Sequence, residues 1–433
     1  MVRTSLCSLD EAMSSCIGRC GPAHDSWLTL NTLKRGYRGL AEFSRCAFGT
    51  ASDVERCYRR CVSQQPPRQA PSARPTVERL PAYRPGKGAA QAEAEHGITN
   101  AIKLASNENP DAPLDAILAA IGAAAADANR YADHRATALR ERIGTWLDVD
   151  AARVAIGAGS VGLLQQLFLT FIDAGDTVVY PWRSFEVYPV YTKLMGGIEV
   201  TTPLTSSHAF DLEALADLAG PSAAVRPRMV VLATPNNPTG TALRTSELRT
   251  LIAGIDPRTV VVIDEAYREF LDPSFGDPVR DLVPEFPNVV VTRTFSKAHG
   301  LAGLRVGYAI GHPEVIALID KTLFPFAVNA LAQVAAVAAI DSIDLIQSRV
   351  EGIVAERARV VASLTADGWR LPDAQANFVY LPLGSRTDAV ALDLEKRGVV
   401  VRPFGNEGIR VTIGTVEQND RFLATLAEVA TPT

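Results

Sequence analysis

Five short apolar runs constrain the fold of this 433-residue chain more than any other feature. They are VAIG (154–157), DTVVYP (176–181), MVVLATP (229–235), TVVVID (259–264) and NVVVTRTF (288–295). Strands that are apolar without alternation are buried on both faces, which is typical of a mostly parallel sheet covered by helices. Amphipathic patterns between several of the runs, at 161–173 and 245–255, predict the covering helices of an α/β fold.

The pattern changes after about residue 325. A long helical stretch (ERARVVASLTADG, 356–368) is followed by the short strand candidates NFVYLPL and GIRVTIG and by a final helical segment. This indicates a second, smaller α+β domain. We therefore expect a large domain over residues 128–322, a small C-terminal domain over 323–433, and an N-terminal segment, 77–127, that packs with the small domain.

The first 76 residues differ from the rest in composition, because they contain all six cysteines and the start of a proline-rich linker that runs over 64–86. A zinc module or a disulfide cap is one interpretation, but the Cys-x3-Cys spacing is not the paired zinc spacing, and no apolar signal core precedes it. We expect a poorly ordered extension, or upstream sequence translated from a misplaced start codon, with the true start near Val77. The cysteines are Cys7, Cys16, Cys20, Cys46, Cys57 and Cys61.

Charge and hydropathy exclude two classes of partner. A net charge of −5 gives no basic surface for nucleic acid or for an anionic membrane. The longest apolar run, LAQVAAVAAI (331–340), stops at Asp341 and is shorter than the roughly 18–20 residues of a membrane span. The sequence therefore predicts a soluble, cytoplasmic protein that acts on small molecules.

Polar and charged residues gather just after the predicted strands, where open α/β sheets bind their ligands. The run GAGSVG (157–162) matches the glycine pattern of dinucleotide-binding folds. However, the next strand ends in Tyr-Pro-Trp-Arg and lacks the acidic residue that would hold a ribose, so NAD is the weaker interpretation. The glycines instead predict a tight turn that opens a helix and offers free N–H groups to a phosphate.

Two other strand ends carry charge. Asp264 ends a buried strand, where a carboxylate is costly unless it meets a cation. Arg305 and Ser296 could donate hydrogen bonds to the predicted phosphate. The alternatives are a structural ion pair for Asp264 and a surface pair for Arg305.

The remaining strand ends supply an amine, an aromatic face and neutral hydrogen-bonding groups. Lys297 supplies the amine, Phe185 a face for ring stacking, and Asn237 and Tyr267 hydrogen bonds. Asn237-Pro238 could instead be only a turn, and Phe185 only a core residue. Taken together, these groups meet the needs of pyridoxal 5'-phosphate: an anion cradle, a carboxylate for the ring nitrogen, and a lysine for the aldehyde.

The motifs that carry these residues resemble those of the fold-type-I aminotransferases, which use pyridoxal 5'-phosphate. They are NPTG (237–240), DEAY (264–267) and SKAHGLAGLR (296–305), in that order. KLASNENP (103–110) and NRYAD (129–133) resemble the histidinol-phosphate aminotransferase-like branch, and the similarity runs from about residue 78 to the end. WRSFEVYP and QANFVYLPLGSRT are most similar to the actinobacterial aromatic amino acid (phenylalanine) aminotransferases within that branch.

The resemblance implies how the cofactor is bound. Lys297 would form the Schiff base and move the proton, Asp264 would pair with the pyridinium nitrogen, and Asn237 and Tyr267 would bind the ring hydroxyl. The phosphate would be held by Ser160, Ser296, Arg305 and the backbone N–H groups from Gly159 to Val161.

The resemblance also implies a partner subunit and a substrate pocket. Tyr131 would reach the phosphate of the partner's cofactor, so the enzyme would be a homodimer with shared active sites. Arg410 would bind the substrate carboxylate through two parallel hydrogen bonds, and Asn109 and Asn237 would line the same pocket.

Several positions depart from the family pattern. Ala132 stands where proline is usual, NENPDAP lacks the common leucine-glycine, and His299 stands where tyrosine is frequent. Ser160-Val161-Gly162 replaces the usual serine-acid-glutamate. These departures weaken any transfer of substrate specificity from true histidinol-phosphate enzymes.

The expected reaction is transfer of the amino group of phenylalanine or tyrosine to 2-oxoglutarate, giving an aromatic 2-oxo acid and glutamate. The first alternative is a histidinol-phosphate aminotransferase. Arg410 does not distinguish the two activities, because a guanidinium suits carboxylate and phosphate alike. A non-catalytic cofactor-binding regulatory domain is disfavoured, because residues 1–75 show no clear helix pair and no strong basic excess.

Overall fold

The computed structural model describes residues 71–80 and 86–432. The six cysteines and about half of the proline-rich linker, on which the predictions for residues 1–76 depend, lie outside these ranges. The chain divides at Ala73, and the unit from Arg74 onward contains both lobes described below. A short helix, α4 (Pro75–Glu78), lies at its start.

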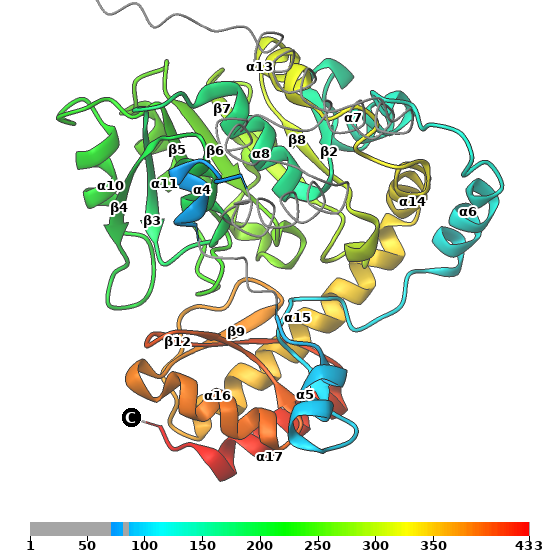
Figure 1. The fold of residues 1–433 in the computed structure, drawn as a ribbon, viewed down its shortest axis with the longest axis vertical. Helices are drawn as coiled ribbons and strands as arrows, with labels where there is room; N and C mark the ends of the chain where they lie inside the picture. Colours follow the sequence, from blue (N-terminus) through cyan, green and yellow to red (C-terminus); the bar gives the residue numbers. More distant parts are fainter. Residues whose placement is uncertain (1–70, 81–85, 433) are drawn as a thin grey trace, which may run out of the picture. The chain divides into compact units, whose positions relative to one another are not determined.

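A seven-stranded sheet forms the centre of the larger lobe, with the order β2-β8-β7-β6-β5-β3-β4 (Figure 1). All neighbours pair in parallel except β8, which is antiparallel to both β2 and β7. The mostly parallel sheet is therefore confirmed, and the five predicted runs are β2, β3, β5, β6 and β7. The strands are β2 (Val154–Gly157), β3 (Thr177–Trp182), β4 (Ile198–Pro203), β5 (Met229–Ala233), β6 (Val260–Asp264), β7 (Val289–Thr294) and β8 (Gly307–Ile310).

Both faces of this sheet are buried under helices. Along β5, Val230 and Leu232 join one apolar core, whereas Met229 and Val231 join the core on the opposite face. Helices α7, α10 and α11 contribute to the first core, and α8, α9 and α13 to the second. These helices are α7 (Thr137–Leu147), α8 (Gly159–Phe171), α9 (Val187–Leu194), α10 (Leu212–Ala219), α11 (Thr245–Ala253) and α13 (Pro313–Ile319), with the short α12 (Pro278–Asp281) nearby in sequence.

The smaller lobe is built on a three-stranded antiparallel sheet, in the order β11-β12-β9. Its strands and helices are β9 (Phe378–Pro382), β11 (Arg402–Phe404), β12 (Gly408–Thr412), α15 (Ile343–Ala366), α16 (Thr387–Lys396) and α17 (Val416–Val429). The N-terminal segment joins this lobe through β1 (Ile102–Lys103), which pairs in parallel with β10 (Val399–Val400), and through α5 (Ala89–His96), which contacts α16 (Figure 1).

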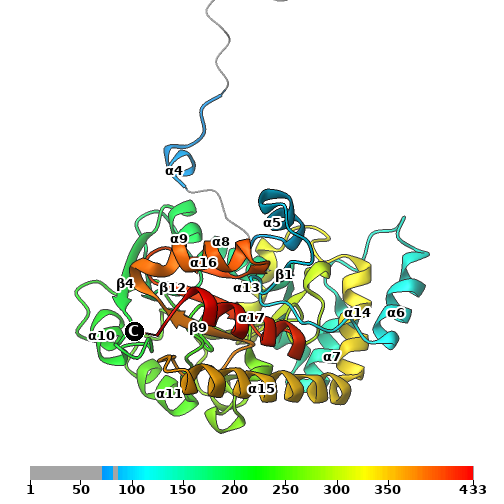
Figure 2. The ribbon, with the colours of Figure 1, turned by 90° about the horizontal axis from the view of Figure 1, so that it is seen from below.

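Two helices connect the lobes. Helix α14 (Ala330–Asp341) packs against α6 (Asp115–Ala125) and α7, on the side of the large sheet. Helix α15 follows directly and packs against β9 and α17; it is the long helix that runs below the small lobe in Figure 2. Helix α14 belongs by sequence to the predicted small domain, 323–433, but it packs with the large lobe. The predicted boundary between residues 322 and 323 therefore stays a prediction.

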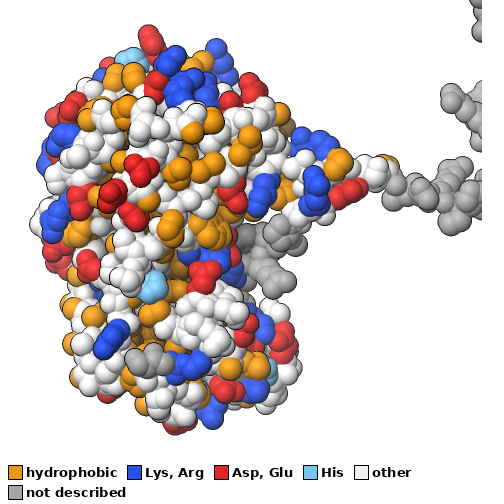
Figure 3. All heavy atoms as spheres, turned by 90° about the vertical axis from the view of Figure 1, so that its left-hand side faces the viewer, with side chains coloured by type: hydrophobic (Ala, Val, Ile, Leu, Met, Phe, Trp, Pro, Cys, Tyr) orange, Lys and Arg blue, Asp and Glu red, His pale blue; other side chains and the backbone are white. Residues whose placement is uncertain are grey.

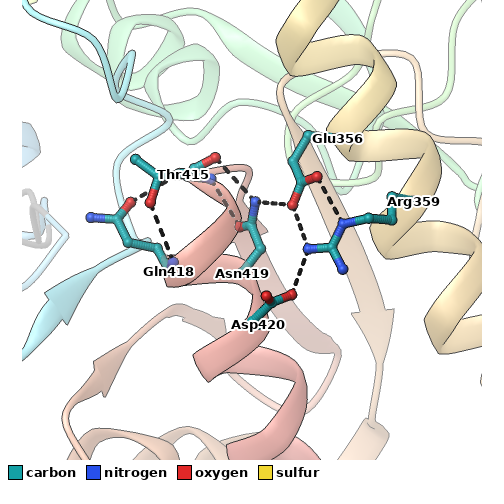
Figure 4. A network of polar contacts seen from close by, with 7 residues as sticks. Glu356, Arg359, Thr415, Gln418, Asn419 and Asp420 are labelled. Atoms are coloured by element: carbon teal, nitrogen blue, oxygen red, sulfur yellow. Dashed lines mark hydrogen bonds and ion pairs between the residues drawn. The ribbon is translucent and has the colours of Figure 1, made fainter.

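A polar network fixes α17 to α15 (Figure 4). Thr415 and Gln418 form a capping box at the start of α17, which satisfies two backbone N–H groups that the helix leaves free. The Nδ2 of Asn419 donates to the Oε1 of Glu356 over 2.9 Å, and Arg359 holds the same carboxylate through two hydrogen bonds. These contacts fix the position of α17 relative to α15 within the small lobe.

The surface carries both signs of charge, with acidic and basic side chains intermixed over the face in Figure 3. Within the described part of the chain, no single helix is long and apolar enough to cross a membrane. Helices α14 and α15 meet that criterion only when taken together, and they are bent by 80° with respect to each other.

Candidate active site

A cavity of about 220 Å³ lies beyond the carboxyl ends of β5, β6 and β7, and residues of the N-terminal segment and the small lobe complete its wall. Most of the residues that the sequence singles out line it, although they come from segments as far apart as 160 and 410. They are Ser160, Val161, Phe185, Asn237, Asp264, Tyr267, Ser296, Lys297, Arg305 and Arg410.

Three predicted residues do not line the cavity. Asn109 donates to the backbone oxygen of Ala298 over 2.9 Å, so it contacts the loop that carries the lysine. Tyr131 is 83% exposed, and its ring stacks on that of Phe326 with 4.4 Å between the centroids. Gly159 begins α8 directly behind the cavity wall.

The start of α8 forms an anion-binding cradle. Its N-cap, Ala158, provides no side-chain acceptor, so the first N–H groups of the helix are left for a ligand. Gly159 has a φ of +73°, and a Cβ there would lie 2.5 Å from an Nη2 of Arg305. Only glycine allows this close approach of the guanidinium to the backbone.

Ser296 and Arg305 complete the cradle. The Nη1 of Arg305 lies 3.3 Å from the Oγ of Ser296, and it also donates to the backbone oxygen of Ala302 over 2.9 Å. Among the described residues, no carboxylate forms an ion pair with Arg305, whereas Arg293 and Arg402 each have one. A guanidinium, a hydroxyl and a helix N-terminus therefore converge where a phosphate would be stabilised.

Asp264 lies at the end of β6 and is 4% exposed. It accepts hydrogen bonds from the hydroxyls of Tyr188, over 2.8 Å, and Thr292, over 3.1 Å. Burial raises the pKa of the carboxyl, and the two hydrogen bonds oppose that effect. Since no cation among the described side chains pairs with it, the structural ion-pair alternative has no partner here, and the carboxylate is available for a cationic ligand.

Lys297 follows β7 on a loop, lines the cavity and is partly buried. Its Nζ donates to the backbone oxygen of Ser106 over 3.1 Å. Burial lowers the pKa of the amine to about 7, with the positive charges of Arg410 and Arg305 acting in the same direction and Glu108 opposing them. A large fraction of the amine is therefore neutral near pH 7, as a nucleophile or a proton acceptor must be.

Arg410 comes from β12 of the small lobe and reaches the large lobe. Its guanidinium donates to the side-chain oxygen of Asn237 and, over 2.8 Å, to the backbone oxygen of Ala105. Two phenyl rings flank it, those of Phe378 at 5.4 Å and Phe404 at 5.6 Å from the guanidinium carbon to the centroid. A cation held in this way, with an apolar surround, suits a carboxylate ligand.

Sequence reasoning missed the residues that orient the predicted ones. Tyr188 donates to Asp264, and Asn107 donates to the hydroxyl of Tyr267 over 2.8 Å. Thr294 donates to the Oγ of Ser296 over 2.9 Å. Both Tyr188 and Asn107 lie within stretches that the sequence draws attention to, but only the fold brings them to their partners.

The lowered pKa of Lys297 predicts a measurable effect on stability. In the cofactor-free protein, Lys297→Met is expected to raise the free energy of unfolding near pH 7 by about 2–4 kcal/mol, because the unfolded chain retains the ordinary lysine pKa. Between the folded pKa, about 7, and the ordinary value of 10.5, the unfolded state binds a proton that the folded state lacks. Wild-type stability therefore rises with pH relative to the variant, and the difference shrinks toward pH 10. Urea unfolding at the two pH values measures it; an equal difference at both would contradict it.

The sequence of this chain matches that of known proteins over most of its length. A family model described as aminotransferase class I and II matches residues 99–426. The aromatic amino acid aminotransferase of Streptomyces coelicolor is 47% identical over 355 residues, which are 82% of this chain and 96% of that protein. The enzyme of the same name from Thermobifida fusca is 48% identical over 359 residues, again 82% and 96% of the two chains.

The fold has relatives of known structure. The histidinol-phosphate aminotransferase of Sinorhizobium meliloti, solved in complex with pyridoxal 5'-phosphate, superposes with a TM-score of 0.76 at 29% identity. The match covers 84% of this chain and 98% of that one. The chain therefore belongs to the class I and II aminotransferases.

Proposed function

We propose that this chain is an aromatic amino acid aminotransferase, which moves the amino group of phenylalanine or tyrosine to 2-oxoglutarate with the help of pyridoxal 5'-phosphate. The observation that carries the proposal is the cavity itself. In it a buried carboxylate, Asp264, and a partly buried amine with a lowered pKa, Lys297, flank an anion-binding cradle. The relatives that are 47% and 48% identical bear the name of this activity.

The residues present fit the cofactor. The glycine at position 159 leaves room for Arg305 beside the start of α8, where the cofactor phosphate would be held with Ser160 and Ser296. Asp264 would face the ring nitrogen, because a buried carboxylate is stabilised by a protonated ring. Asn237, Tyr267 and Phe185 would contact the ring hydroxyl and face. When bound, pyridoxal 5'-phosphate supplies an aldehyde carbon and an electron-accepting ring.

The chain's own groups would divide the remaining tasks. Lys297 would hold the cofactor through its Nζ and would take the proton from the substrate Cα. Arg410 would bind the substrate carboxylate and so orient that Cα–H toward the amine. Arg410 is buried and Lys297 is partly buried, which would limit the access of water to the proton.

The most specific part of the proposal is that the substrate carries an aromatic side chain. Phe185 and Phe404 line the cavity and offer apolar surface to a ring. Histidinol phosphate is the second candidate, because a structural relative bears that name, but at 29% identity it is more distant than the aromatic enzymes.

A direct comparison of donors tests the choice. We expect kcat/KM for phenylalanine to exceed that for histidinol phosphate by at least about tenfold, each measured with 2-oxoglutarate, since one well-placed polar or charged group commonly separates substrates by that factor or more. Chromatography of the 2-oxo acid or glutamate product gives both rates. Faster turnover of histidinol phosphate would replace the proposed activity with the second candidate.

A second copy of the chain is part of the proposal. Tyr131 and Phe326 form an exposed aromatic pair, with 83% and 42% of their surfaces accessible in the single chain. We propose that a homodimer covers this pair and that Tyr131 reaches the phosphate of the cofactor in the partner subunit. A cytoplasmic location, as expected from the sequence, completes the proposal.

A further inference from the structure

An ion pair lies in the cavity apart from the groups assigned so far. The Nη2 of Arg402, in β11 of the small lobe, lies 2.8 Å from the Oε2 of Glu186, which directly precedes α9 in the large lobe. Both side chains line the cavity, and they are 14% and 37% exposed. The pair therefore contributes to the cavity wall that the two lobes build together.

The neighbouring strand explains why Arg402 needs a counter-ion. Arg402 in β11 and Arg410 in β12 are directly opposite in the antiparallel register, so their side chains leave the same face of the sheet. Each guanidinium carbon lies 5.6 Å from the centroid of the Phe404 ring. Like charges at opposite positions repel each other, and a carboxylate beside one of them relieves the repulsion.

We propose that Glu186 determines which side chains this enzyme accepts, by neutralising Arg402 in the part of the cavity beyond the carboxylate-binding Arg410. An uncharged aromatic ring then meets Phe404, Phe185 and a guanidinium whose charge is already balanced. A phosphorylated side chain meets the carboxylate of Glu186 and is rejected, because juxtaposed like charges are costly in a partly buried site. This inference rests on the proposed aromatic aminotransferase activity.

The chain offers a matched control. Arg183 and Glu407 form a second ion pair between the same two lobes, with the Nε of Arg183 2.9 Å from a carboxylate oxygen. Glu407 follows β11 on the turn to β12 but does not line the cavity. Removing its charge therefore alters the same interface without altering the charge of the cavity wall.

The test compares Glu186→Gln with Glu407→Gln in the holoenzyme. The first half-reaction is followed by the absorbance of the cofactor, with phenylalanine or histidinol phosphate as the only added substrate, so that the amino acceptor plays no part. We expect Glu186→Gln to lower the preference for phenylalanine, as a ratio of kcat/KM values, by about tenfold. Glu407→Gln is expected to leave the ratio within about twofold, and Glu186→Asp, which keeps the charge, to retain most of the preference.

A binding measurement gives a readout that does not depend on turnover. Inorganic phosphate, titrated into the holoenzyme in a calorimeter, is expected to bind about tenfold more tightly to Glu186→Gln than to wild type or Glu407→Gln. An unchanged ratio and unchanged phosphate affinity in Glu186→Gln, or equal changes in both variants, would overturn the inference while wild-type activity on phenylalanine stands. A wild type inactive on phenylalanine would overturn the proposed function and this inference with it.

Discussion

Replacing Lys297 with alanine is expected to lower turnover of phenylalanine by at least about a thousandfold, while the protein still folds and binds the cofactor. Among the described residues it is the only lysine that lines the cavity, and its lowered pKa allows it to act as a base near pH 7. The anion cradle does not include it, so the cofactor phosphate retains its contacts. Turnover is measured with 2-oxoglutarate as acceptor, and cofactor binding by fluorescence.

Covalent trapping separates this role from a structural one. Borohydride treatment of the wild-type holoenzyme, followed by peptide mass spectrometry, is expected to leave the cofactor mass on Lys297 and to leave none on the alanine variant. Lys103→Ala is a matched control, because that lysine is close enough to influence the pKa of Lys297 but pairs with Glu108 outside the cavity lining. Wild-type-like turnover in Lys297→Ala, or trapping on another lysine, would contradict the assignment.

The central sheet was predictable because its strands are buried on both faces. Every residue of β5, β6 and β7 is buried, and each strand contains an apolar run that can be recognised from the sequence alone. The prediction missed β4, an edge strand with several exposed residues, and β8, which begins just after the SKAHGLAGLR motif. In β8, a Cβ at Gly307 would lie 2.6 Å from the backbone nitrogen of Ser160, so the close approach of the strand to α8 requires glycine at this position.

The candidate site was predictable to the extent that its residues follow strands. Asp264 and Lys297 could be placed together because parallel strands bring their carboxyl ends to one edge. The pairing of Glu186 with Arg402 could not be predicted. The two residues lie more than 200 positions apart in the sequence and belong to different lobes, and no local spacing in the sequence indicates that the lobes meet there. The same reason applies to Tyr188, whose hydroxyl finds Asp264 only once α9 packs on the sheet.

Asp264→Asn is expected to lower turnover by about a hundredfold or more, because the amide cannot hold the ring nitrogen of the cofactor in its protonated form. The substitution keeps the shape of the side chain, so Tyr188 and Thr292 retain a group to contact. Burial raises the pKa of Asp264, which means that its charged form is unfavourable in the cofactor-free protein. The free energy of unfolding of the cofactor-free variant near pH 7 is therefore expected to equal or exceed that of wild type, although activity is lost.

A cofactor analogue distinguishes the lost charge from a lost shape. N-methylated pyridoxal phosphate carries a permanent positive charge on the ring nitrogen and needs no carboxylate to keep it. If Asp264 acts by holding a proton there, the analogue recovers a substantial part of the turnover of Asp264→Asn but does not accelerate Lys297→Ala, in which the proton acceptor itself is missing. If the analogue fails to help Asp264→Asn although it binds, Asp264 acts by another route, and the buried carboxylate at the end of β6 then requires a different cationic partner.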